Sequence, residues 1–399
     1  MGLVVVGASE SIARVARKLD DDVVFVDGPG SGCRTASQDD GGRSFTVDWH
    51  DEAVLTEFAR RVLAPLAPRA VVSVTEHGLL PAALLSGVLG TPGAPVNVVR
   101  ATRDKLLMRR ILAARAAHLT VGHADARDEP AVADLLSRCD RVVVKPAHGT
   151  ASTDVRLVRS LEEFRRTTDP EGLIVEEFAE GTEYSVESFS RDGRHEVIGI
   201  VEKGTADGFV EVSHVMPADL PAGRERLIGR AVSELLDALG LRDGPAHTEV
   251  KVHGDTVKVV ETHNRPGGDS IADLVTIVTG IDWRAVSLGW PLGLRPTAST
   301  PQAPAAASVF FTAPPGTVTE VRAAAPEWPD VTVEYWKIET SVGDRVEELR
   351  SSSDRLGTAV LSGGSAAACR AAVRGLRERP VVVTEAGRTA NVAPEHTKV

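Results

Sequence analysis

Residues 247–268 read HTEVKVHGDTVKVVETHNRPGG and are the most informative part of the chain for its fold. Two valine-rich runs, His247–Val252 and Thr256–Glu261, flank a Gly-Asp turn, a pattern that predicts an antiparallel hairpin. In such a hairpin Glu249 and Glu261 lie close together across the ladder. Both carboxylates alternate with valines, so we expect them on one face of the sheet.

Two carboxylates held together on one face need a cation between them. Their oxygen atoms are the ligands that Mg²⁺ prefers, and the phosphates of a nucleotide usually complete its coordination. Arg265 follows Glu261 by four residues and could hold a transferring phosphoryl group or the oxygens of an acyl-phosphate. The alternative is an acidic hairpin exposed to solvent, which the nearby Arg265 and Gly267-Gly268 make less favoured.

Two lysines precede this hairpin and suit nucleotide phosphates. Lys105 lies on a polar helix expected to begin near Thr102, and Lys145 ends the buried strand RVVVK, where a charge needs a partner. A lysine is a compact charge suited to phosphate oxygens, and the chain has no Walker-type phosphate loop. The loop 148–153 (HGTAST) has side chains small enough for its backbone N–H groups to approach a phosphate. The alternative is that both lysines are ordinary surface residues.

The segment Leu173–Ala179 (LIVEEFA) has the form of a hinge beside an adenine base. Its backbone can offer one donor and one acceptor to the purine edge, and the Glu176 carboxylate can accept from the exocyclic amine. Glu183 follows seven residues after Glu176 and could reach ribose hydroxyls. A plain strand with a solvated acidic turn explains this segment equally well.

The composition excludes several classes of function. The chain has 399 residues and a net charge of −11, with no clustered basic patch, which argues against nucleic-acid binding. Its three cysteines, Cys33, Cys139 and Cys369, show no zinc or disulfide spacing. No apolar run reaches the ~18 residues of a membrane span, and the N-terminus does not resemble a signal peptide. We therefore expect a cytoplasmic protein with two to four domains or lobes.

The first hundred residues alternate strands and helices. Leu3–Val6, a Gly-Ala-Ser turn, a helix that reaches Leu19 and the run Val23–Val26 begin a doubly wound sheet, and Ala70–Val74 adds a strand. A Rossmann dinucleotide site is disfavoured, because only Gly7 is present where the motif needs three glycines.

The rest of the chain changes character twice. Residues 197–215 predict antiparallel strands, with turns at Asp192-Gly193 and Asp207-Gly208, and a long helix follows over 224–239. After an Ala/Pro-rich linker at 301–304, the last hundred residues predict a small α+β lobe.

Taken in order, the motifs resemble the ATP-grasp superfamily. They are Asp104-Lys105, Lys145-Pro146 with its small-residue loop, Glu-Glu-Phe followed by Gly-x-Glu, and Glu249 with Glu-x-x-x-Arg-x-Gly-Gly. Each motif is modest alone, but the ordered set is specific and covers most of the chain. The resemblance implies a fold of the α/β and α+β classes. Its parts would be a Rossmann-like pre-ATP-grasp domain over 1–100, an ATP-grasp domain over 101–300 (small lobe about 115–180, large lobe about 181–300) and a small C-terminal α+β lobe over 301–399.

Within that superfamily the chain is most similar to the L-amino-acid ligases and related carboxylate–amine ligases. The similarity includes FVEVSH at 209–214 with Pro217 just after it, His247-Thr248-Glu249, and Ser362-Gly363-Gly364. Carried over, the resemblance implies contacts to ATP phosphates for Lys105, Lys145, Gly149 and Ser152, to adenine for Glu176, Phe178 and Ala179, and to ribose for Glu183. It further implies Mg²⁺ ligands at Glu249 and Glu261, stabilisation of the acyl-phosphate and the tetrahedral intermediate by Arg265, and a place for His214 near the substrate carboxylate or the γ-phosphate.

One position departs from the family pattern. The usual motif is Glu-x-Asn-x-Arg, whose Asn is a metal ligand, but His263 stands at that position here and Asn264 comes one residue later. Adjacent strand residues face opposite sides, so we expect His263 on the face of Glu261 and Asn264 away from it. Imidazole matches Mg²⁺ less well than oxygen does. We therefore expect His263 either to contact metal or phosphate as a softer ligand or to weaken one metal site, with some use of Mn²⁺.

The resemblance implies an enzyme that joins a carboxylate to an amine in two steps. The carboxylate attacks the γ-phosphate of ATP to give an acyl-phosphate and ADP, and an amine then displaces phosphate to give an amide, of dipeptide type for amino-acid substrates. Two alternatives stay open: a purine-biosynthetic or carboxylase-type ATP-grasp enzyme, and a nucleotide-binding protein weakened in catalysis. The expected cofactors are ATP and Mg²⁺, the expected partners are small molecules without nucleic acid or membrane, and a homodimer is left open.

Overall fold

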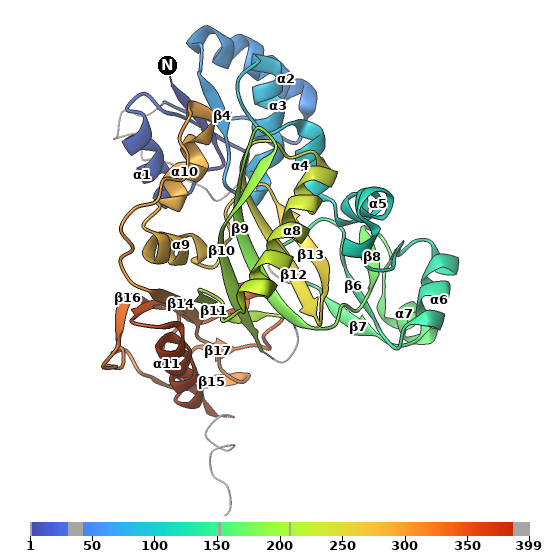
Figure 1. Ribbon diagram of the computed structural model, residues 1–399, viewed down its shortest axis with the longest axis vertical. Coiled ribbons are helices and arrows are strands. Elements are labelled where there is room, and N and C mark those ends of the chain that lie inside the picture. Colours follow the sequence, from blue (N-terminus) through green and yellow to red (C-terminus); the bar gives the residue numbers. More distant parts are fainter. Residues whose placement is uncertain (1, 31–42, 151–152, 207–208, 386–399) are drawn as a thin grey trace, which may run out of the picture.

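The computed structural model describes residues 2–30, 43–150, 153–206 and 209–385. Figure 1 shows the N-terminal domain at the top, a small sheet at the right and the C-terminal region at the lower left, all adjoining one long sheet. The predicted turn at Asp207-Gly208 lies outside the described residues. Among the helices that are described, none is both long and apolar enough to cross a membrane.

The N-terminal residues form a parallel sheet with strand order β3-β2-β1-β4. Its central strands are short valine-rich runs because helices cover both faces, and this confirms the α/β prediction. The strands are β1 (Leu3–Val6), β2 (Val24–Asp27), β3 (Arg43–Thr46) and β4 (Ala70–Val72), and the helices are α1 (Glu10–Leu19), α2 (Glu52–Phe58) and α3 (Leu79–Leu89).

The polar helix predicted to begin near Thr102 is instead two helices, α4 (Val96–Arg103) and α5 (Lys105–Arg115). The break is at Asp104, whose backbone is extended and whose side chain accepts from the Leu107 N–H as the N-cap of α5. The correction matters for the site, because it makes Lys105 the first residue of a helix.

The small sheet has the order β5-β8-β6-β7 and is antiparallel throughout. Its strands are β5 (His123–Asp125), β6 (Val142–Pro146), β7 (Arg156–Val158) and β8 (Leu173–Glu177), and helices α6 (Glu129–Arg138) and α7 (Leu161–Thr167) pack on it. The strands predicted around Lys145 and Glu176 are therefore neighbours, and Val143 pairs with Glu176.

The long sheet has eight strands in the order β13-β12-β9-β10-β11-β14-β18-β16. Its first five are β9 (Thr182–Arg191), β10 (Arg194–Thr205), β11 (Glu211–Met216), β12 (Gly244–His253) and β13 (Thr256–His263). Helix α8 (Ala222–Leu239) buries one face, while α9 (Ile271–Thr279) and α10 (Trp283–Gly289) pack on the other. The predicted hairpin is confirmed, since Glu249 pairs directly with Glu261.

A β-bulge at Val260 turns Glu261 toward the pocket. Val250 pairs with Val259, and both lie in the core under α8, while the next pair is Glu249 with Glu261. Without the extra residue, strict alternation would put Glu261 on the same side as Val259. The prediction that the two carboxylates share a face is correct, but the bulge is what brings it about.

The C-terminal region continues the long sheet instead of forming a sheet wholly its own. Strands β14 (Ala305–Phe310), β16 (Val331–Ile338) and β18 (Gly357–Gly363) extend it beyond β11. A three-stranded sheet of β15 (Gly316–Val321), β17 (Arg345–Val346) and β19 (Val382–Thr384) and helix α11 (Ala366–Glu378) complete the region. The sheet thus crosses the predicted boundary near residue 301, and β11 lies directly beside a C-terminal strand.

Candidate functional site

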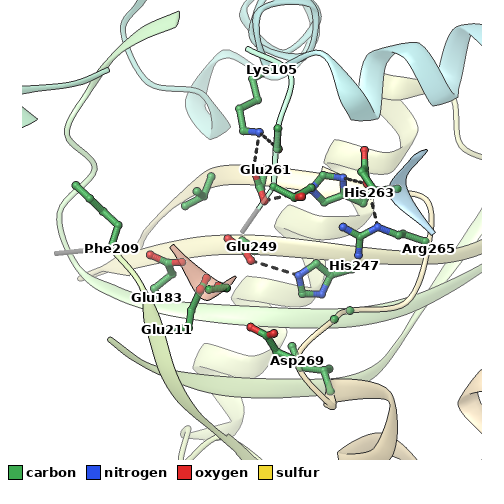
Figure 2. A pocket seen from close by; sticks show the side chains of 18 of the residues that line it. Lys105, Glu183, Phe209, Glu211, His247, Glu249, Glu261, His263, Arg265 and Asp269 are labelled. Atoms are coloured by element: carbon green, nitrogen blue, oxygen red, sulfur yellow. Dashed lines mark hydrogen bonds and ion pairs between the residues drawn. The ribbon is translucent and has the colours of Figure 1, made fainter. Parts of the chain in front are cut away.

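One pocket of 560 Å³ is lined by the N-terminal domain, the small sheet and the long sheet together (Figure 2). It collects every site residue predicted from the sequence that lies in the described part of the chain. These are Lys105, Lys145, Gly149, Glu176, Phe178, Ala179, Glu183, His214, Glu249, Glu261, His263 and Arg265. Ser152 lies outside the described residues.

Lys105 joins three elements at the pocket wall. Its Nζ lies 2.9 Å from Glu261 Oε2 and donates to the Gly149 carbonyl at 2.8 Å. Burial alone would lower the pKa of Lys105, but Glu261, with Glu176 and Glu76 further away, outweighs it and raises the pKa above its ordinary value. The ammonium is therefore charged, as a group that meets phosphate must be.

Both oxygens of Glu176 are held by cations. Arg109 Nε donates to Oε1 at 2.7 Å, and Lys145 Nζ lies 2.8 Å from Oε2. Burial raises the pKa of Glu176, but the two cations outweigh it and lower the pKa to about 2. Glu176 is therefore an anion that fixes Lys145 at the pocket wall. Its contact with an adenine amine stays a prediction, as do the adenine contacts of Phe178 and Ala179.

Arg109, a buried residue that the sequence analysis gave no role, connects Glu176 to the bulge. Its guanidinium donates to the carbonyls of Val259 at 2.7 Å and Val260 at 3.0 Å. A bulge disrupts the ladder, and a buried carbonyl without a partner costs about 1–3 kcal/mol. The fork of donors on Arg109 removes that cost. The signal was its spacing of four from Lys105, which places both on one helix face.

A row of charged side chains crosses five neighbouring strands. Glu261, Glu249, Glu183, Lys203 and Glu211 come from β13, β12, β9, β10 and β11 in that order. Lys203 Nζ lies 2.7 Å from Glu183, 2.9 Å from Glu211 and 2.9 Å from Glu249. Figure 2 shows Glu249 between Glu261 and the pair formed by Glu183 and Glu211.

The carboxylates of this row include a cluster that differs in part from the metal ligands predicted from the sequence. Among the described residues, Glu183, Glu211 and Glu249 form a group of three carboxylates whose ligand atoms lie within 4.8 Å of one another, near enough to hold one metal ion together. The predicted metal set was Glu249, Glu261 and His263. Burial opposes the charge on Lys203, but the three carboxylates outweigh it and raise the pKa of Lys203 well above its ordinary value. Burial also raises the pKa of Glu211.

His247 links Glu249 to a fully buried carboxylate. Its Nδ1 lies 2.6 Å from Glu187 Oε1 and its Nε2 lies 3.3 Å from Glu249 Oε1. Burial alone would lower the pKa of His247, but hydrogen bonds to the two carboxylates outweigh it and raise the pKa to about 9. Glu187 also accepts from Trp283 Nε1 at 2.6 Å and from the Gly267 N–H at 3.0 Å. The protonated imidazole therefore orients Glu249.

His263 occupies the matching position beside Glu261. Its Nε2 lies 3.1 Å from Glu261 Oε1, and its Nδ1 makes an ion-pair contact at 3.0 Å with Glu76 Oε2. The rings of His247 and His263 stack with centroids 6.5 Å apart. Asn264 points away, as predicted, and accepts from Thr102 Oγ1 through its side chain at 3.0 Å. Because both nitrogens of His263 face carboxylates, its role as a metal ligand stays only a prediction.

Glu76, which the sequence analysis did not single out, brings the N-terminal domain to the site. It accepts from Arg265 Nε at 2.9 Å and from Arg103 Nε at 3.0 Å. Burial raises its pKa, but His263 and Arg265 outweigh this and leave the pKa well below its ordinary value. The clue was its place directly after a buried strand, at the sheet edge where parallel α/β folds bind ligands.

The turn after Arg265 is held tightly against this network. A Cβ at Gly267 would lie 2.7 Å from Glu187 Oε1 and 2.8 Å from His247 Nδ1, so only glycine fits. Asp269 and Ser270 follow with φ of 53° and 63°, a left-handed backbone that costs roughly 1 kcal/mol or more per residue. Strain of this kind persists only where the surroundings impose it.

His214 is neutral, with a tautomer that its neighbours determine. Burial, the largest influence, lowers the pKa of His214 to about 3. Ser308 Oγ donates its one hydrogen to the Asp269 carbonyl at 3.0 Å, so the His214 Nδ1 contact to that oxygen, at 3.3 Å, has the imidazole as donor. His214 Nε2 therefore carries a lone pair.

The donor set fits the metal and nucleotide that the motifs imply. Carboxylate oxygens from four strands line one wall, and oxygen is the donor that Mg²⁺ prefers. Lys105 lies against Glu261 and Lys145 against Glu176 in the same pocket, and lysine is well suited to phosphate oxygens.

Comparison with protein families gives the same assignment. Residues 165–273 match the model of an ATP-grasp domain. They contain the small-sheet strand β8 and the acidic hairpin. The model of the L-amino acid ligase C-terminal domain 2 matches residues 309–385, from the end of β14 onward. The ATP-grasp resemblance that the motifs suggested is thereby confirmed.

The chain matches two curated relatives over only part of the length of each relative. The alanine–anticapsin ligase of Bacillus subtilis is 26% identical over 265 residues, which is 59% of this chain and 56% of that protein. Carnosine synthase 1 of Gallus gallus is 26% identical over 281 residues, which is 62% of this chain and 30% of that protein. The chain therefore spans about half the length of the first relative and less of the second.

Two solved structures share the fold over almost the whole chain. The L-amino acid ligase from Bacillus licheniformis has a TM-score of 0.73 at 22% identity and covers 96% of this chain and 98% of that chain. Phosphoribosylglycinamide synthetase from Anaerococcus prevotii has a TM-score of 0.69 at 17% identity, with the same coverage of 96% and 98%. These likenesses confirm the predicted fold class.

Proposed function

We propose that this protein is an ATP-dependent carboxylate–amine ligase that forms an amide through an acyl-phosphate and releases ADP and phosphate. The observation that carries the proposal is that the Glu249–Glu261 pair, Arg265 and two lysines, Lys105 and Lys145, line one pocket. The match of the C-terminal region to an L-amino acid ligase domain supports amino acids as the substrates.

The first step transfers the γ-phosphoryl group from ATP to a substrate carboxylate. Glu249 and Glu261 would hold Mg²⁺, with Glu183 and Glu211 beside them, and the ion would neutralise charge on the phosphates. Lys105 and Lys145 are fixed by Glu261 and Glu176, so they meet the phosphates already oriented. Positioning and neutralisation of charge are most of what phosphoryl transfer requires of a protein.

Arg265 would stabilise the acyl-phosphate. Its Nε is bound to Glu76 and its Nη1 to the Pro266 carbonyl, which fixes the plane of the guanidinium. Within the described residues Nη2 makes no hydrogen bond, so it can donate to an oxygen of the acyl-phosphate and of the tetrahedral intermediate.

In the second step the amine replaces phosphate on the acyl carbon, and one proton must leave the nitrogen. The amine nitrogen attacks the acyl carbon, the bond from that carbon to the phosphate oxygen breaks, and the nitrogen loses a proton. The departing phosphate oxygen can accept that proton, because burial lowers the pKa of His214 to about 3 and makes it a weak base. His214 lines the pocket as a neutral imidazole that can contact the substrate carboxylate or the γ-phosphate.

The test mixes the protein with ATP, Mg²⁺ and pooled amino acids and follows ADP, phosphate and new amide masses. The proposal expects ADP formation that depends on the amino acids, with one amide formed for each phosphate. Arg265→Ala should lose turnover and keep ATP binding, while Arg322→Ala, at an exposed arginine paired with Glu320, should keep both. Binding of ATP without turnover in any amino-acid pool would contradict the proposal, as would turnover only with a purine precursor or bicarbonate.

A further inference from the structure

Arg355, from the C-terminal region, reaches the wall of the pocket. Its Nη1 and Nη2 donate to the two oxygens of Asp269 at 2.7 Å and 2.9 Å, a two-pronged pair. Nη2 also lies 3.4 Å from Glu211 Oε2. The arginine side chain is 6% exposed, and both of its acidic partners line the pocket although Arg355 does not.

The fold presents Arg355 rigidly. It stands between a short helical turn at Ser352–Asp354, closed by a capping box, and the start of β18. On its C-terminal side Leu356 N–H donates to the Phe311 carbonyl, and Phe311 N–H donates to the Gly357 carbonyl. The guanidinium carbon lies 3.8 Å from the centroid of the Phe310 ring, a cation–π contact. Backbone and ring together fix the direction of the side chain.

The two residues that Arg355 holds belong to different parts of the site. Asp269 lies in the left-handed turn that follows Arg265, and its carbonyl accepts from Ser308 on β14. Glu211 is one of the three carboxylates close enough to share a metal ion. The Arg355 guanidinium therefore links the turn at Asp269 to the carboxylate cluster formed by Glu183, Glu211 and Glu249.

We propose that Arg355 is a positioning residue that holds the turn at Asp269 and the Glu211 side chain in the geometry needed for metal–nucleotide binding. The C-terminal region thereby contributes to the site. The proposal rests on the proposed function only in treating the cluster as a metal–nucleotide site. Outer residues that orient metal ligands change metal affinity or activity by about 10–100-fold when they are replaced.

The chain offers a matched control in Arg370 on α11. It is also an arginine of the C-terminal region that binds two carboxylates of the long-sheet region, Glu202 at 3.2 Å and Asp219 at 3.0 Å. Neither partner lines the pocket. If Arg355 only attached the C-terminal region to the rest of the chain, loss of Arg370 should have a similar effect.

The experiment compares Arg355→Met, Arg355→Lys and Arg370→Met in the full chain. Binding of Mn²⁺ with a non-hydrolysable ATP analogue is followed from the electron paramagnetic resonance signal of free Mn²⁺, and thermal unfolding checks that each variant is folded. Turnover is then measured with the amino-acid pool, and kcat is separated from KM.

The expected result is Mn²⁺–nucleotide binding weakened by about tenfold or more in Arg355→Met. Arg355→Lys should lie between this variant and the unaltered chain, because lysine keeps the charge but lacks the fork. Arg370→Met should stay within about twofold of the unaltered chain. Equal binding by folded Arg355→Met and the unaltered chain would overturn the proposal, and so would equal losses in Arg355→Met and Arg370→Met. If Arg355→Met fails to fold, undiminished binding by Arg355→Lys overturns it. The binding measurement needs no turnover, so a chain without ligase activity would refute the proposed function and leave this test in place.

Discussion

Glu249 and Glu261 face each other across one hairpin, and each is held by a lysine and by a histidine two residues away on its own strand. Behind each histidine stands a further carboxylate: Glu187 behind the one beside Glu249, and Glu76 behind the one beside Glu261. Each of the two glutamates, together with its lysine, its histidine and the carboxylate behind that histidine, is called an arm of the site. The two arms contain the same types of residue. They differ in where the partners come from.

The arm of Glu249 lies entirely within the long sheet. Lys203 and Glu187 are on neighbouring strands, and the Glu187 side chain is 0% exposed. The arm of Glu261 reaches Lys105 on α5 and Glu76 in the N-terminal domain, with the Glu76 side chain 22% exposed. The sheet alone therefore positions Glu249, whereas the position of Glu261 depends also on contacts from α5 and the N-terminal domain.

Removal of the histidines should separate the two arms most strongly. His247→Ala takes one donor from a fully buried carboxylate and should reduce the free energy of unfolding by about 3–5 kcal/mol. His263→Ala should cost about 1–2 kcal/mol, because Glu76 keeps two arginines and Glu261 keeps Lys105. Urea denaturation of both variants measures the difference. Equal losses, or the reverse order, would contradict the comparison.

The dependence of stability on pH should reflect the protonation of His247, the histidine beside Glu249. The pKa of His247 is raised from 6.5 to about 9 in the folded protein. Its contribution is therefore complete below about pH 6.5 and is lost as the pH rises through 9, with a ceiling of about 3 kcal/mol. Urea denaturation curves measured from about pH 6 to about pH 10 cover this decline. The free energy of unfolding should fall with rising pH in the unaltered chain and should fall less in His247→Gln. Parallel curves would rule out the raised pKa.

Stabilisation by nucleotide should depend on Lys105, the lysine that holds Glu261. Mg²⁺-ATP at about a hundred times its Kd should stabilise the unaltered chain by about 2.7 kcal/mol. Lys105→Met should lose most of that gain, because it removes a charge from the phosphate side and a partner from Glu261. Lys18→Met, at an exposed helix end, is the control. Thermal unfolding with and without nucleotide measures both, and a full gain in Lys105→Met would place the phosphates elsewhere.

The smallest effect is expected for His263→Asn, which restores the usual motif. If His263 serves as a link between Glu76 and Glu261, half-saturating Mg²⁺ and Mn²⁺ should each change by less than about tenfold, and their ratio should stay the same. Metal titrations of ADP formation measure this. A strong shift of preference from Mn²⁺ to Mg²⁺ would instead make the imidazole a metal ligand.

Much of this site could be predicted from the sequence, because the residues involved sit in motifs with local physical causes. The alternation of valine and glutamate predicts the hairpin, and the spacing of His263, Asn264 and Arg265 predicts which of them face the pocket. The N-terminal sheet follows from its short apolar runs. These inferences use only neighbours in the chain.

What could not be predicted depends on contacts between distant segments. The bulge at Val260 is invisible in the sequence, and so is its stabilisation by Arg109, about 150 positions earlier. Lys203 reads as an ordinary strand residue until β9, β11 and β12 bring three carboxylates to it. The same holds for Arg355, whose partners lie in two other elements. The break at Asp104 was missed because an N-cap inside a polar helical stretch resembles any other acidic residue.

In the proposed reaction, ATP phosphorylates a substrate carboxylate in this pocket. The most direct test supplies pooled amino acids labelled with oxygen-18 in both carboxylate oxygens, together with ATP and Mg²⁺, and analyses the phosphate by mass spectrometry. If the carboxylate is phosphorylated, the phosphate carries one heavy oxygen and forms with ADP in step with an amide that retains the other. Unlabelled phosphate alone, or the release of AMP and pyrophosphate, would contradict the proposed reaction.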